Sequence, residues 1–382
     1  PTVNLRMKRL ILVGGGHSHV EVLRCFAMQP LPDTELTLID PATEAAYSGM
    51  LPGWIAGHYA REQCHIDLAR LCRRADCRLV LTRCIGMNSD ARQVFCENDA
   101  TLAFDLVSVD TGGRSPAFDI PGAVQHALPV RPVESFVTRW TAICNDVAQG
   151  RGPGRVAVVG AGAAGVEVLL AMQHRLGGAA PGHVVRFVLV SDSHSILPEH
   201  SASAKRRFVR ILRQRNVDLE LGRGVVRISK GVLECADAQN IRADLIVIAT
   251  GASAPFWPKA VGLATDTRGF ILVDEHLQSV SHPAIFAAGD IATVRNMPRP
   301  KSGVFAVRAG PPLAENLRRT LLSQPLRRWT PQPLSLALIS TGERHAIASR
   351  GGFTAQGRWV WRWKDWIDRR FVERYAGNDK GA

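Results

Sequence analysis

Residues 156–169 read VAVVGAGAAGVEVL, in which a short apolar run leads into a glycine-rich turn and a second apolar run. The run from Val156 to Val159 is typical of a buried strand. The turn that follows, Gly160-Ala161-Gly162-Ala163-Ala164-Gly165, matches the Gly-x-Gly-x-x-Gly pattern that joins a strand to a helix around a dinucleotide. With a strand before it and a helix after it, the pattern predicts a phosphate-binding turn.

The same unit occurs earlier in the chain. Residues 10–23 read LILVGGGHSHVEVL, so the two units match without a gap through Val-Gly-x-Gly and Val-Glu-Val-Leu. Further on, Asp105-Leu106 leading to Thr111-Gly112 is repeated as Asp244-Leu245 leading to Thr250-Gly251. Two linked motifs in the same order indicate a duplicated structural unit.

Each unit predicts a strand, a turn, a helix and a second strand, the last at Glu35 to Ile39 or Val184 to Val190. Crossovers of this kind are right-handed and join parallel strands. We therefore expect an α/β protein of two nested, three-layered Rossmann-like domains. Breaks rich in Pro and Gly set the expected bounds: residues 1–125 and 280–325 for the first domain, 126–279 for the second, and 326–382 for a C-terminal region.

The composition narrows the class of protein. The chain has 382 residues, of which 46% are hydrophobic, enough for two or three domains. A formal charge of +13 suits an anionic partner or merely a solvated basic surface. No RNA- or DNA-binding motif accompanies this charge, so nucleic acid is not expected as a partner.

The eight cysteines are scattered and include no Cys-x-x-Cys pair, a pattern typical of reduced thiols in a cytosolic protein. The first residues carry no secretion signal. The longest apolar run, Val156 to Met172, is interrupted by glycines and Glu167, which argues against a transmembrane helix. We expect a cytoplasmic chain without a metal site.

The first glycine turn is incomplete, because His19 occupies the place of the third glycine. Asp40 supports a dinucleotide site at this turn, because it ends the second strand, where a carboxylate can accept hydrogen bonds from an adenosine ribose. The alternative is that Asp40 only caps the turn before Pro41. His17 and His19 either donate to phosphate oxygens or serve as caps and packing residues.

In the second unit the corresponding strand ends in Val190-Ser191-Asp192, so the carboxylate is displaced by one residue. Lys205, Arg206 and Arg207 follow nearby. This arrangement favours NADH over NADPH only weakly.

A further segment, Ile285-Phe286-Ala287-Ala288-Gly289-Asp290, completes a recognisable order of motifs. With it, the sequence resembles the pyridine nucleotide-disulfide oxidoreductase superfamily, flavoproteins with two dinucleotide-binding domains. The GGGHSH opening, the stretch YSGMLPG at residues 47–53, Lys301 to Gly310 and the Trp-rich tail look like one branch. That branch is related to type II NADH dehydrogenases and also occurs fused to selenophosphate synthetase (selenide, water dikinase). The likeness covers roughly residues 9–375.

This resemblance implies FAD on the first turn and NADH or NADPH on the second. It assigns Asp290 to the ribityl chain and aims a helix after Lys301 at the flavin, where that ammonium would stabilise reduced flavin; otherwise Lys301 is a surface lysine. Glu167 would lie near the nicotinamide, or be a helix-start carboxylate. The implied FAD residues are Gly14, Gly16, His17, Ser18, His19, Asp40, Gly49, Leu51, Thr111, Gly112, Gly289, Asp290, Lys301 and Gly303. Those for NAD(P)H are Gly160, Gly162, Ala164, Gly165, Glu167, Asp192, Thr250 and Gly251.

Departures from the superfamily pattern exclude some chemistry. Disulfide reductases carry a Cys-x-x-x-x-Cys pair soon after the position of Asp40, but residues 41–57 contain no cysteine. Cys72 and Cys77 have this spacing too late in the chain and are expected to be structural. Sulfide:quinone oxidoreductases need a cysteine near the C-terminus, whereas none follows Cys235.

What remains is hydride transfer from nicotinamide to flavin, followed by electron delivery to an acceptor, with a quinone as the leading choice. The alternatives are a non-catalytic flavin-based redox sensor and a flavoprotein associated with selenium metabolism.

The tail predicts an amphipathic basic helix. Five apolar residues recur at helical spacing between several arginines: Trp359, Trp363, Ile367, Phe371 and Tyr375. Such a helix can rest on an anionic membrane, which would make the chain peripheral to the cytoplasmic face. It can equally dock against the protein's own core, or against a second subunit in a homodimer.

Overall fold

The computed structural model describes residues 7–177, 182 and 184–376. Its first sheet has five parallel strands in the order β19-β9-β1-β2-β5. These strands are β1 (Lys8–Val13), β2 (Thr34–Asp40), β5 (Cys77–Leu81), β9 (Leu106–Val109) and β19 (Ile285–Ala287). Because β19 follows the whole second domain in sequence yet pairs with β9, the first domain is discontinuous.

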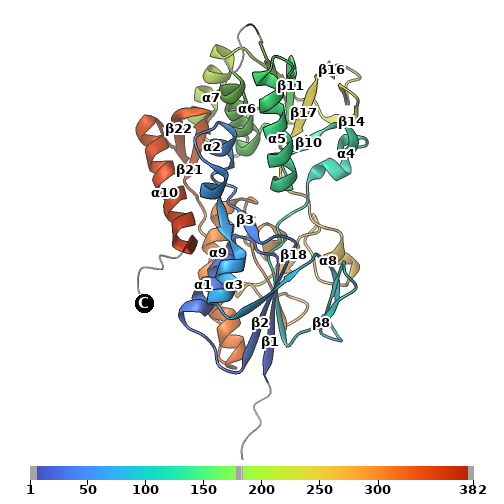
Figure 1. Cartoon of the computed structure of the whole chain (residues 1–382), viewed down its shortest axis with the longest axis vertical. Coiled ribbons are helices and arrows are strands. Elements are labelled where there is room, and N and C mark those ends of the chain that lie inside the picture. The colour runs from blue at the N-terminus through green and yellow to red at the C-terminus, as the bar shows by residue number, and fades with distance from the viewer. Residues whose placement is uncertain (1–6, 178–181, 183, 377–382) are drawn as a thin grey trace, which may run out of the picture.

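The second sheet repeats this plan with five parallel strands in the order β10-β17-β11-β12-β13. They are β10 (Leu128–Pro129), β11 (Arg155–Val159), β12 (Arg186–Ser191), β13 (Val217–Leu221) and β17 (Leu245–Ile248). In Figure 1 the first sheet lies in the lower half of the molecule and the second in the upper half. The predicted α/β class with two Rossmann-like domains is confirmed.

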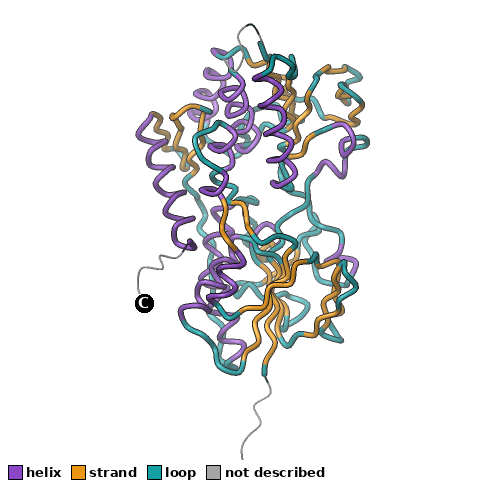
Figure 2. The backbone as a smooth tube through the Cα atoms, in the orientation of Figure 1, coloured by secondary structure: helices purple, strands orange, loops and turns teal. Residues whose placement is uncertain are grey.

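Helices flank both sheets (Figure 2). Each glycine turn leads into a helix: α1 (His17–Met28) in the first domain and α6 (Ala163–Leu176) in the second. Helix α9 (Gly303–Leu321) packs along α1 so closely that a Cβ on Gly310 would lie 2.7 Å from the Cβ of Glu21. The other helices are α2 (Leu51–Ile55), α3 (Leu68–Arg74), α4 (Ala123–His126), α5 (Val133–Ala148), α7 (Ala202–Gln214) and α8 (Trp257–Ala260).

The two domains also contain smaller sheets. Three-stranded antiparallel meanders are formed by β6 (Cys84–Asn88), β7 (Gln93–Cys96) and β8 (Thr101–Ala103), and by β14 (Val225–Ser229), β15 (Val232–Cys235) and β16 (Asn240–Arg242). Two-stranded pairs are formed by β3 (Glu44–Ala46) with β4 (His65–Asp67), and by β18 (Ile271–Val273) with β20 (Ala292–Val294).

The hydrophobic cores correct the domain boundaries expected at residues 125 and 280. Ala117 and Ala123 pack into the core of the second domain with Ile228. Leu263 and Ile271 belong to the core of the first domain instead. The chain therefore crosses between domains near residues 115 and 255, where the two linkers exchange backbone hydrogen bonds between Arg114 and Ser253. The Pro- and Gly-rich breaks lie further along the chain because they end surface turns within each domain.

The C-terminal region consists of a three-stranded antiparallel sheet, β21 (Ala337–Thr341), β22 (Glu343–Arg350) and β23 (Phe353–Gly357), and the helix α10 (Arg358–Ala376). It bridges the two domains, as Figure 1 shows on its left side. Ile339 and Ile347 join the core of the second domain, whereas Phe371 and Tyr375 join that of the first.

Helix α10 does not present the predicted apolar stripe as one face. A spacing of four residues at about 100° per residue advances roughly 40° at each step, so a long series winds around the helix. Phe371 and Tyr375 are buried, whereas Trp359, Trp363 and Ile367 are exposed, together with Trp366. One face of α10 is therefore exposed, whereas Val360, Trp361, Phe371 and Tyr375 pack internally.

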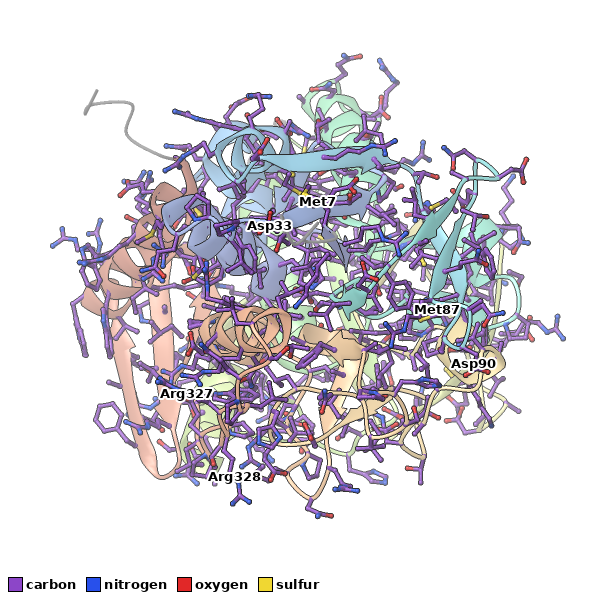
Figure 3. All side chains as sticks on the ribbon, turned by 90° about the horizontal axis from the view of Figure 1, so that it is seen from below. Met7, Asp33, Met87, Asp90, Arg327 and Arg328 are labelled. Atoms are coloured by element: carbon purple, nitrogen blue, oxygen red, sulfur yellow. The ribbon has the colours of Figure 1, made fainter. Side chains whose placement is uncertain are left out.

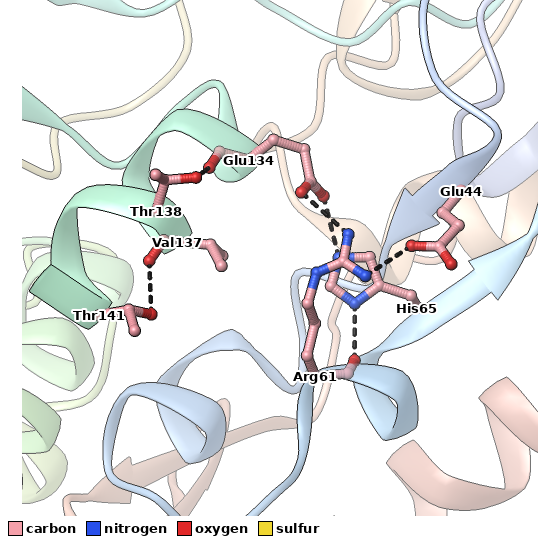
Figure 4. Close-up of polar contacts among 7 residues, drawn as sticks. All are labelled: Glu44, Arg61, His65, Glu134, Val137, Thr138 and Thr141. Carbon is pink, nitrogen blue, oxygen red and sulfur yellow. Dashed lines mark hydrogen bonds and ion pairs between the residues drawn. The ribbon is translucent and has the colours of Figure 1, made fainter.

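A group of polar side chains also joins the two domains (Figure 4). Arg61 donates to Glu44 at 2.8 Å and to Glu134 of α5 at 3.1 Å. The Nε2 of His65 lies 2.9 Å from the same Glu134 carboxylate, and its Nδ1 donates to the carbonyl of Arg61 at 2.7 Å, which orients the ring. Since Glu134 is about half exposed, this contact fixes geometry more than it stabilises the fold.

Part of the basic surface is neutralised locally. Arg327 lies 3.6 Å from Glu315, and Arg328 lies 3.4 Å from Glu275. Both arginines project outward in Figure 3, which views the molecule from below. None of the described helices combines the length and hydropathy needed to cross a bilayer.

Candidate dinucleotide sites and the cluster beside them

The first glycine turn closes around a buried carboxylate that the sequence did not single out. Gly14 has φ +89°, and a Cβ there would lie 2.6 Å from the carbonyl oxygen of Asp110. A Cβ on Gly16 would overlap the Asp110 carboxyl group. That carboxylate accepts hydrogen bonds from the backbone N–H groups of Ser18 at 2.8 Å and His19 at 3.1 Å. Burial raises the pKa of Asp110 to about 7.

The three polar residues after the turn have different surroundings. His19 is fully buried, with Nδ1 on the carbonyl of Gly14 and Nε2 2.8 Å from the hydroxyl of Ser108. The hydroxyl of Ser18 donates to Ala306 of α9 at 2.7 Å. These bonds occupy both side chains within the fold, which favours the packing alternative for His19, while contact of Ser18 with FAD stays a prediction.

His17 differs, because its Nε2 is buried without a hydrogen-bond partner among the described residues. Burial lowers the pKa of His17 to about 4, so the ring is neutral at physiological pH. It packs edge-on against Tyr47, with ring centroids 5.4 Å apart. A buried nitrogen without a partner is expensive, and a bound ligand is one way to satisfy it.

Asp40 holds the turn from the other side. Its carboxylate accepts from the backbone N–H of Gly15 at 2.7 Å and of Ala42 at 2.8 Å. The second bond is the turn cap considered as an alternative for Asp40, and the first ties the end of β2 to the glycine turn. Burial raises the pKa of Asp40.

The segment after β19 meets the same turn. Gly289 has φ +70°, and a Cβ there would overlap the Asp110 carboxylate. The next residue, Asp290, accepts from Arg131 at 3.0 Å. Its side chain is 11% exposed, against 41% for Arg131. Asp290 therefore keeps one accessible edge beside His17.

Of the residues expected around a flavin, Gly303 lies at the start of α9 beside the segment that contains Gly49. A Cβ on Gly303 would lie 3.4 Å from the hydroxyl of Ser48, next to Gly49. Leu51 begins α2 and packs into the core of the second domain.

Lys301 turns back toward β20. Its ammonium donates to the carbonyl of Ala292 at 2.5 Å and to the hydroxyl of Thr293 at 2.9 Å, and it lies 4.1 Å from the ring centroid of Phe270. Burial lowers the pKa of Lys301 to about 8. Lys301 is thus a half-buried group that contacts β20, and its contact with a flavin stays a prediction.

The second glycine turn is more open. Gly160 has φ +114°, with its Cβ position 2.8 Å from the carbonyl oxygen of Ala249. A Cβ on Gly165 would overlap the carbonyl oxygen of Gly160, so this third glycine lets α6 pack on the sheet. By contrast, a Cβ on Gly162 would meet nothing within 4 Å. Ala164 is exposed beside it.

The other predicted nucleotide residues follow strand ends in the two domains. The hydroxyl of Thr250 is buried without a partner among the described residues, and Gly251 beside it faces open space. Thr111 is exposed and Gly112 faces open space in the first domain. Asp192 follows the last residue of β12 and lies 3.4 Å from the hydroxyl of Ser191.

A cluster of buried charges lies where α6, α10 and residues 47–49 meet. The ammonium of Lys364 donates to Asp368 at 2.6 Å and to the carbonyl of Gly49 at 2.7 Å. The hydroxyl of Tyr47 donates to Asp368 at 3.1 Å. Glu167 of α6 accepts from the backbone N–H of Ser340 at 2.7 Å. We call Glu167, Lys364, Asp368 and Tyr47 the junction cluster.

The junction cluster carries two carboxylates and one ammonium. Burial raises the pKa of Glu167 and that of Asp368. Burial alone would lower the pKa of Lys364, but the carboxylates of Asp368 and Glu167 outweigh it and raise that pKa. All three shifts favour the protonated forms, so the cluster is suited to holding a proton.

A small cavity of about 10 Å³ adjoins the junction cluster. Its lining combines Gly49 and Pro52 with Ser340, Trp361 and Lys364. That volume is close to the space needed by one water molecule. The cavity thus marks a break in packing beside the charges.

Sequence reasoning missed four of these residues. Asp110 stands where the second unit has Ala249, so a comparison of the two units could have found it. Arg131 follows the end of a strand in the second domain, and no sequence motif marks it as a site residue. Lys364 and Asp368 are spaced i,i+4, which on sequence alone reads as an ordinary exposed helical ion pair.

All eight cysteines are free, and Cys72 and Cys77 lie in the core of the first domain. Among the described residues, no group of three or more His, Cys, Asp or Glu side chains is arranged to hold a metal ion. The geometry thus provides glycine turns, unpartnered polar atoms and buried charge, and no dithiol after Asp40.

Comparison with known proteins agrees with this geometry. A sequence profile of the family described as pyridine nucleotide-disulphide oxidoreductase matches residues 8–310. A NADH dehydrogenase-like protein of Mycobacterium tuberculosis strain H37Rv is 25% identical over 298 residues, covering 75% of this chain and 74% of its own. Ferroptosis suppressor protein 1 of Xenopus tropicalis is 23% identical over 282 residues, covering 70% of each.

Solved structures share the fold at low sequence identity. The sulfide:quinone oxidoreductase of Aquifex aeolicus has a TM-score of 0.81 at 16% identity, over 96% of this chain and 91% of its own. NDH2 from Plasmodium falciparum, solved with NADH, has a TM-score of 0.78 at 14% identity, over 96% and 98%. The chain belongs to the pyridine nucleotide-disulphide oxidoreductases, a family of FAD-dependent enzymes with a nicotinamide cosubstrate.

Proposed function

We propose that this chain is an FAD-dependent oxidoreductase that takes electrons from NADH or NADPH and delivers them to a quinone. The NADH dehydrogenase-like relative supports the electron donor. The fold shared with a sulfide:quinone oxidoreductase supports the class of acceptor, while the absence of cysteine after Cys235 argues against sulfide as the donor. The observation that carries the proposal is the junction cluster, which offers protons beside the flavin region.

The residues of the first turn fit FAD. Its diphosphate would rest on the N–H groups of Gly16 and His17, since those of Ser18 and His19 are taken by Asp110. Asp40 lies at the end of β2, within reach of the adenosine ribose. Asp290 and the unpartnered Nε2 of His17 would bind the sugar-alcohol chain. Bound FAD supplies a ring that accepts a hydride and passes electrons on.

The second turn would hold the nicotinamide nucleotide. The open space beside Gly162 leaves room for a diphosphate at the start of α6. The unpartnered hydroxyl of Thr250 would donate to the nucleotide. Asp192 would accept from a ribose hydroxyl and repel a 2′-phosphate, which favours NADH.

The junction cluster would serve the acceptor. Reducing a quinone to a quinol consumes two protons in addition to two electrons. The pKa values of Glu167 and Asp368 are raised, and the positive charge of Lys364 interacts with both carboxylates. We assign Glu167 the role of passing a proton toward the acceptor, and Tyr47 and Asp368 the role of orienting Lys364.

Glu167→Gln tests this assignment. Glutamine keeps an oxygen to accept from Ser340 but cannot deliver a proton. Anaerobic bleaching of the flavin by NADH should stay within about twofold of the parent protein, whereas reoxidation by a water-soluble ubiquinone analogue should slow by about 100-fold. Glu343→Gln, an exposed change on β22, is the matched control and should alter neither step.

Three other outcomes refute parts of the proposal. If NADH and NADPH both fail to bleach the flavin, the chain is a redox sensor and not this enzyme. If bleaching occurs but no quinone reoxidises the flavin, the acceptor is wrong. If Glu167→Gln slows bleaching and reoxidation equally, Glu167 acts at the nicotinamide.

We also propose that the exposed face of α10 rests on an anionic membrane. Trp359, Trp363, Trp366 and Ile367 are 36–55% exposed on this face. Arg370 lies 5.2 Å from the ring centroid of Trp366. Exposed tryptophans beside arginines are typical of helices that lie in the membrane interface. This position would bring the junction cluster near a lipid-soluble quinone.

A further inference from the structure

A cavity of about 370 Å³ opens where the two linkers meet, and its lining includes no residue of either glycine turn or of the junction cluster. We call it the linker pocket. Its lining consists of Arg114, Asp119, residues 252–256, Lys259 and residues 268–270. Its volume lies within the range of small-molecule sites.

The linker pocket is positively charged. Arg114 donates to the carbonyl of Ala254 at 2.9 Å and to Asp119 at 2.5 Å, which neutralises its charge. Lys259 and Arg268 are exposed on the rim and form no ion pair within the part of the chain that the structure describes. Two uncompensated positive charges therefore face one cavity.

Arg114 also carries an unpartnered donor. Its second terminal nitrogen is buried and makes no hydrogen bond among the described residues. A buried guanidinium N–H without an acceptor is unfavourable, because it has lost its hydrogen bonds to water without replacement. An anion in the linker pocket would accept from it.

The aromatic side chains complete the pocket. Phe256 is 72% exposed, and the guanidinium of Arg114 lies 4.2 Å from its ring centroid. Arg268 lies 5.1 Å from the ring centroid of Phe270. An exposed phenylalanine ring at the mouth of a cationic cavity suits a ligand with a planar ring and a negative group.

We propose that the linker pocket binds a small phosphorylated compound with an aromatic ring, of the size of a nucleoside monophosphate. The phosphoryl group would lie between Lys259, Arg268 and Arg114, and the ring would stack on Phe256. Because Arg114 and Ser253 pair across the linkers, the ligand would contact the joint between the two domains. The site does not depend on which acceptor the enzyme uses.

Calorimetric titration of the FAD-loaded protein with AMP, adenosine and inorganic phosphate tests the proposal. We expect AMP to bind, adenosine to bind at least tenfold more weakly, and saturating NAD⁺ to leave AMP binding unchanged. Lys259→Ala with Arg268→Ala should weaken AMP binding at least tenfold without changing the flavin spectrum. Lys230→Ala with Arg242→Ala, which removes the same charge from a distant exposed surface, should change nothing.

Each other outcome overturns the proposal. If AMP does not bind, the linker pocket does not recognise a nucleoside monophosphate. If NAD⁺ displaces AMP, the ligand occupies the nicotinamide site. If adenosine binds as well as AMP, or if phosphate binding survives loss of both cations, the charges on the rim do not recognise the phosphoryl group.

Discussion

Replacing Asp110 with asparagine should change how stability depends on pH. The carboxylate is fully buried against Gly14, Gly16 and Gly289, and burial raises its pKa from the ordinary 3.8 to about 7. A group that binds its proton more tightly when folded stabilises the fold at low pH. That stabilisation is fully present below about pH 4 and is lost as the pH rises to about 7.

The magnitude follows from the shift. A change of about three pKa units corresponds to about 4 kcal/mol, since each unit is worth about 1.4 kcal/mol. Asparagine has nearly the same shape and still offers an oxygen to the N–H groups of Ser18 and His19. The variant should therefore be more stable than the parent protein by an amount that grows from pH 4 to pH 8 toward about 4 kcal/mol.

Urea unfolding followed by tryptophan fluorescence, repeated across this pH range, measures the difference in unfolding free energy. Asp90→Asn, a change at an exposed carboxylate, is the control and should give a difference that does not vary with pH. A constant difference for Asp110→Asn would refute the reasoning, because Asp110 would then keep an ordinary pKa in the folded protein. The FAD dissociation constant should also fall more at pH 8 than at pH 5, since a negative charge beside the diphosphate is removed.

Other changes separate packing from ligand binding. Gly165→Ala should lower the unfolding free energy by about 1–3 kcal/mol, because the added methyl group would overlap a backbone carbonyl. Gly162→Ala should leave stability unchanged, since its Cβ meets nothing, yet weaken NADH binding, as equilibrium titration of flavin-loaded protein would measure. Asp192→Ala should raise KM for NADH about tenfold and leave that for NADPH within twofold, and equal effects on both would exclude Asp192 from cosubstrate selection. Trp359→Ser with Trp366→Ser should abolish co-sedimentation with anionic vesicles, whereas unchanged sedimentation would mean that α10 is no membrane surface.

The parts of the fold that the sequence predicted are those set by local patterns. Both glycine turns, their strands and their helices follow from backbone geometry that only glycine adopts, as at Gly14 and Gly160. The domain order follows from the same motifs. Boundaries were less accurate, because which core a segment such as residues 257–273 joins depends on tertiary packing and leaves no local signal.

The site was predicted in outline but not in its electrostatics. Asp110 and Lys364 take their character from burial against residues far away in sequence, Gly289 and Gly49 respectively. His19 looked like a ligand because it occupies a glycine position, yet both its ring nitrogens bond within the core. The sequence analysis placed exposed tryptophans and buried aromatic residues of α10 in one apolar stripe. A four-residue spacing instead winds around a helix, so these residues face different sides.

The pairing of β19 with β9 also bears on how the chain matures during synthesis. Ile285 lies beside Val107 in the complete sheet. One edge of β9 therefore stays unpaired while roughly 180 further residues are synthesised. At about 5–20 residues per second this takes roughly 10 to 35 seconds. The inserted domain can fold in that interval, while the open edge of β9 is a place where nascent chains could pair wrongly.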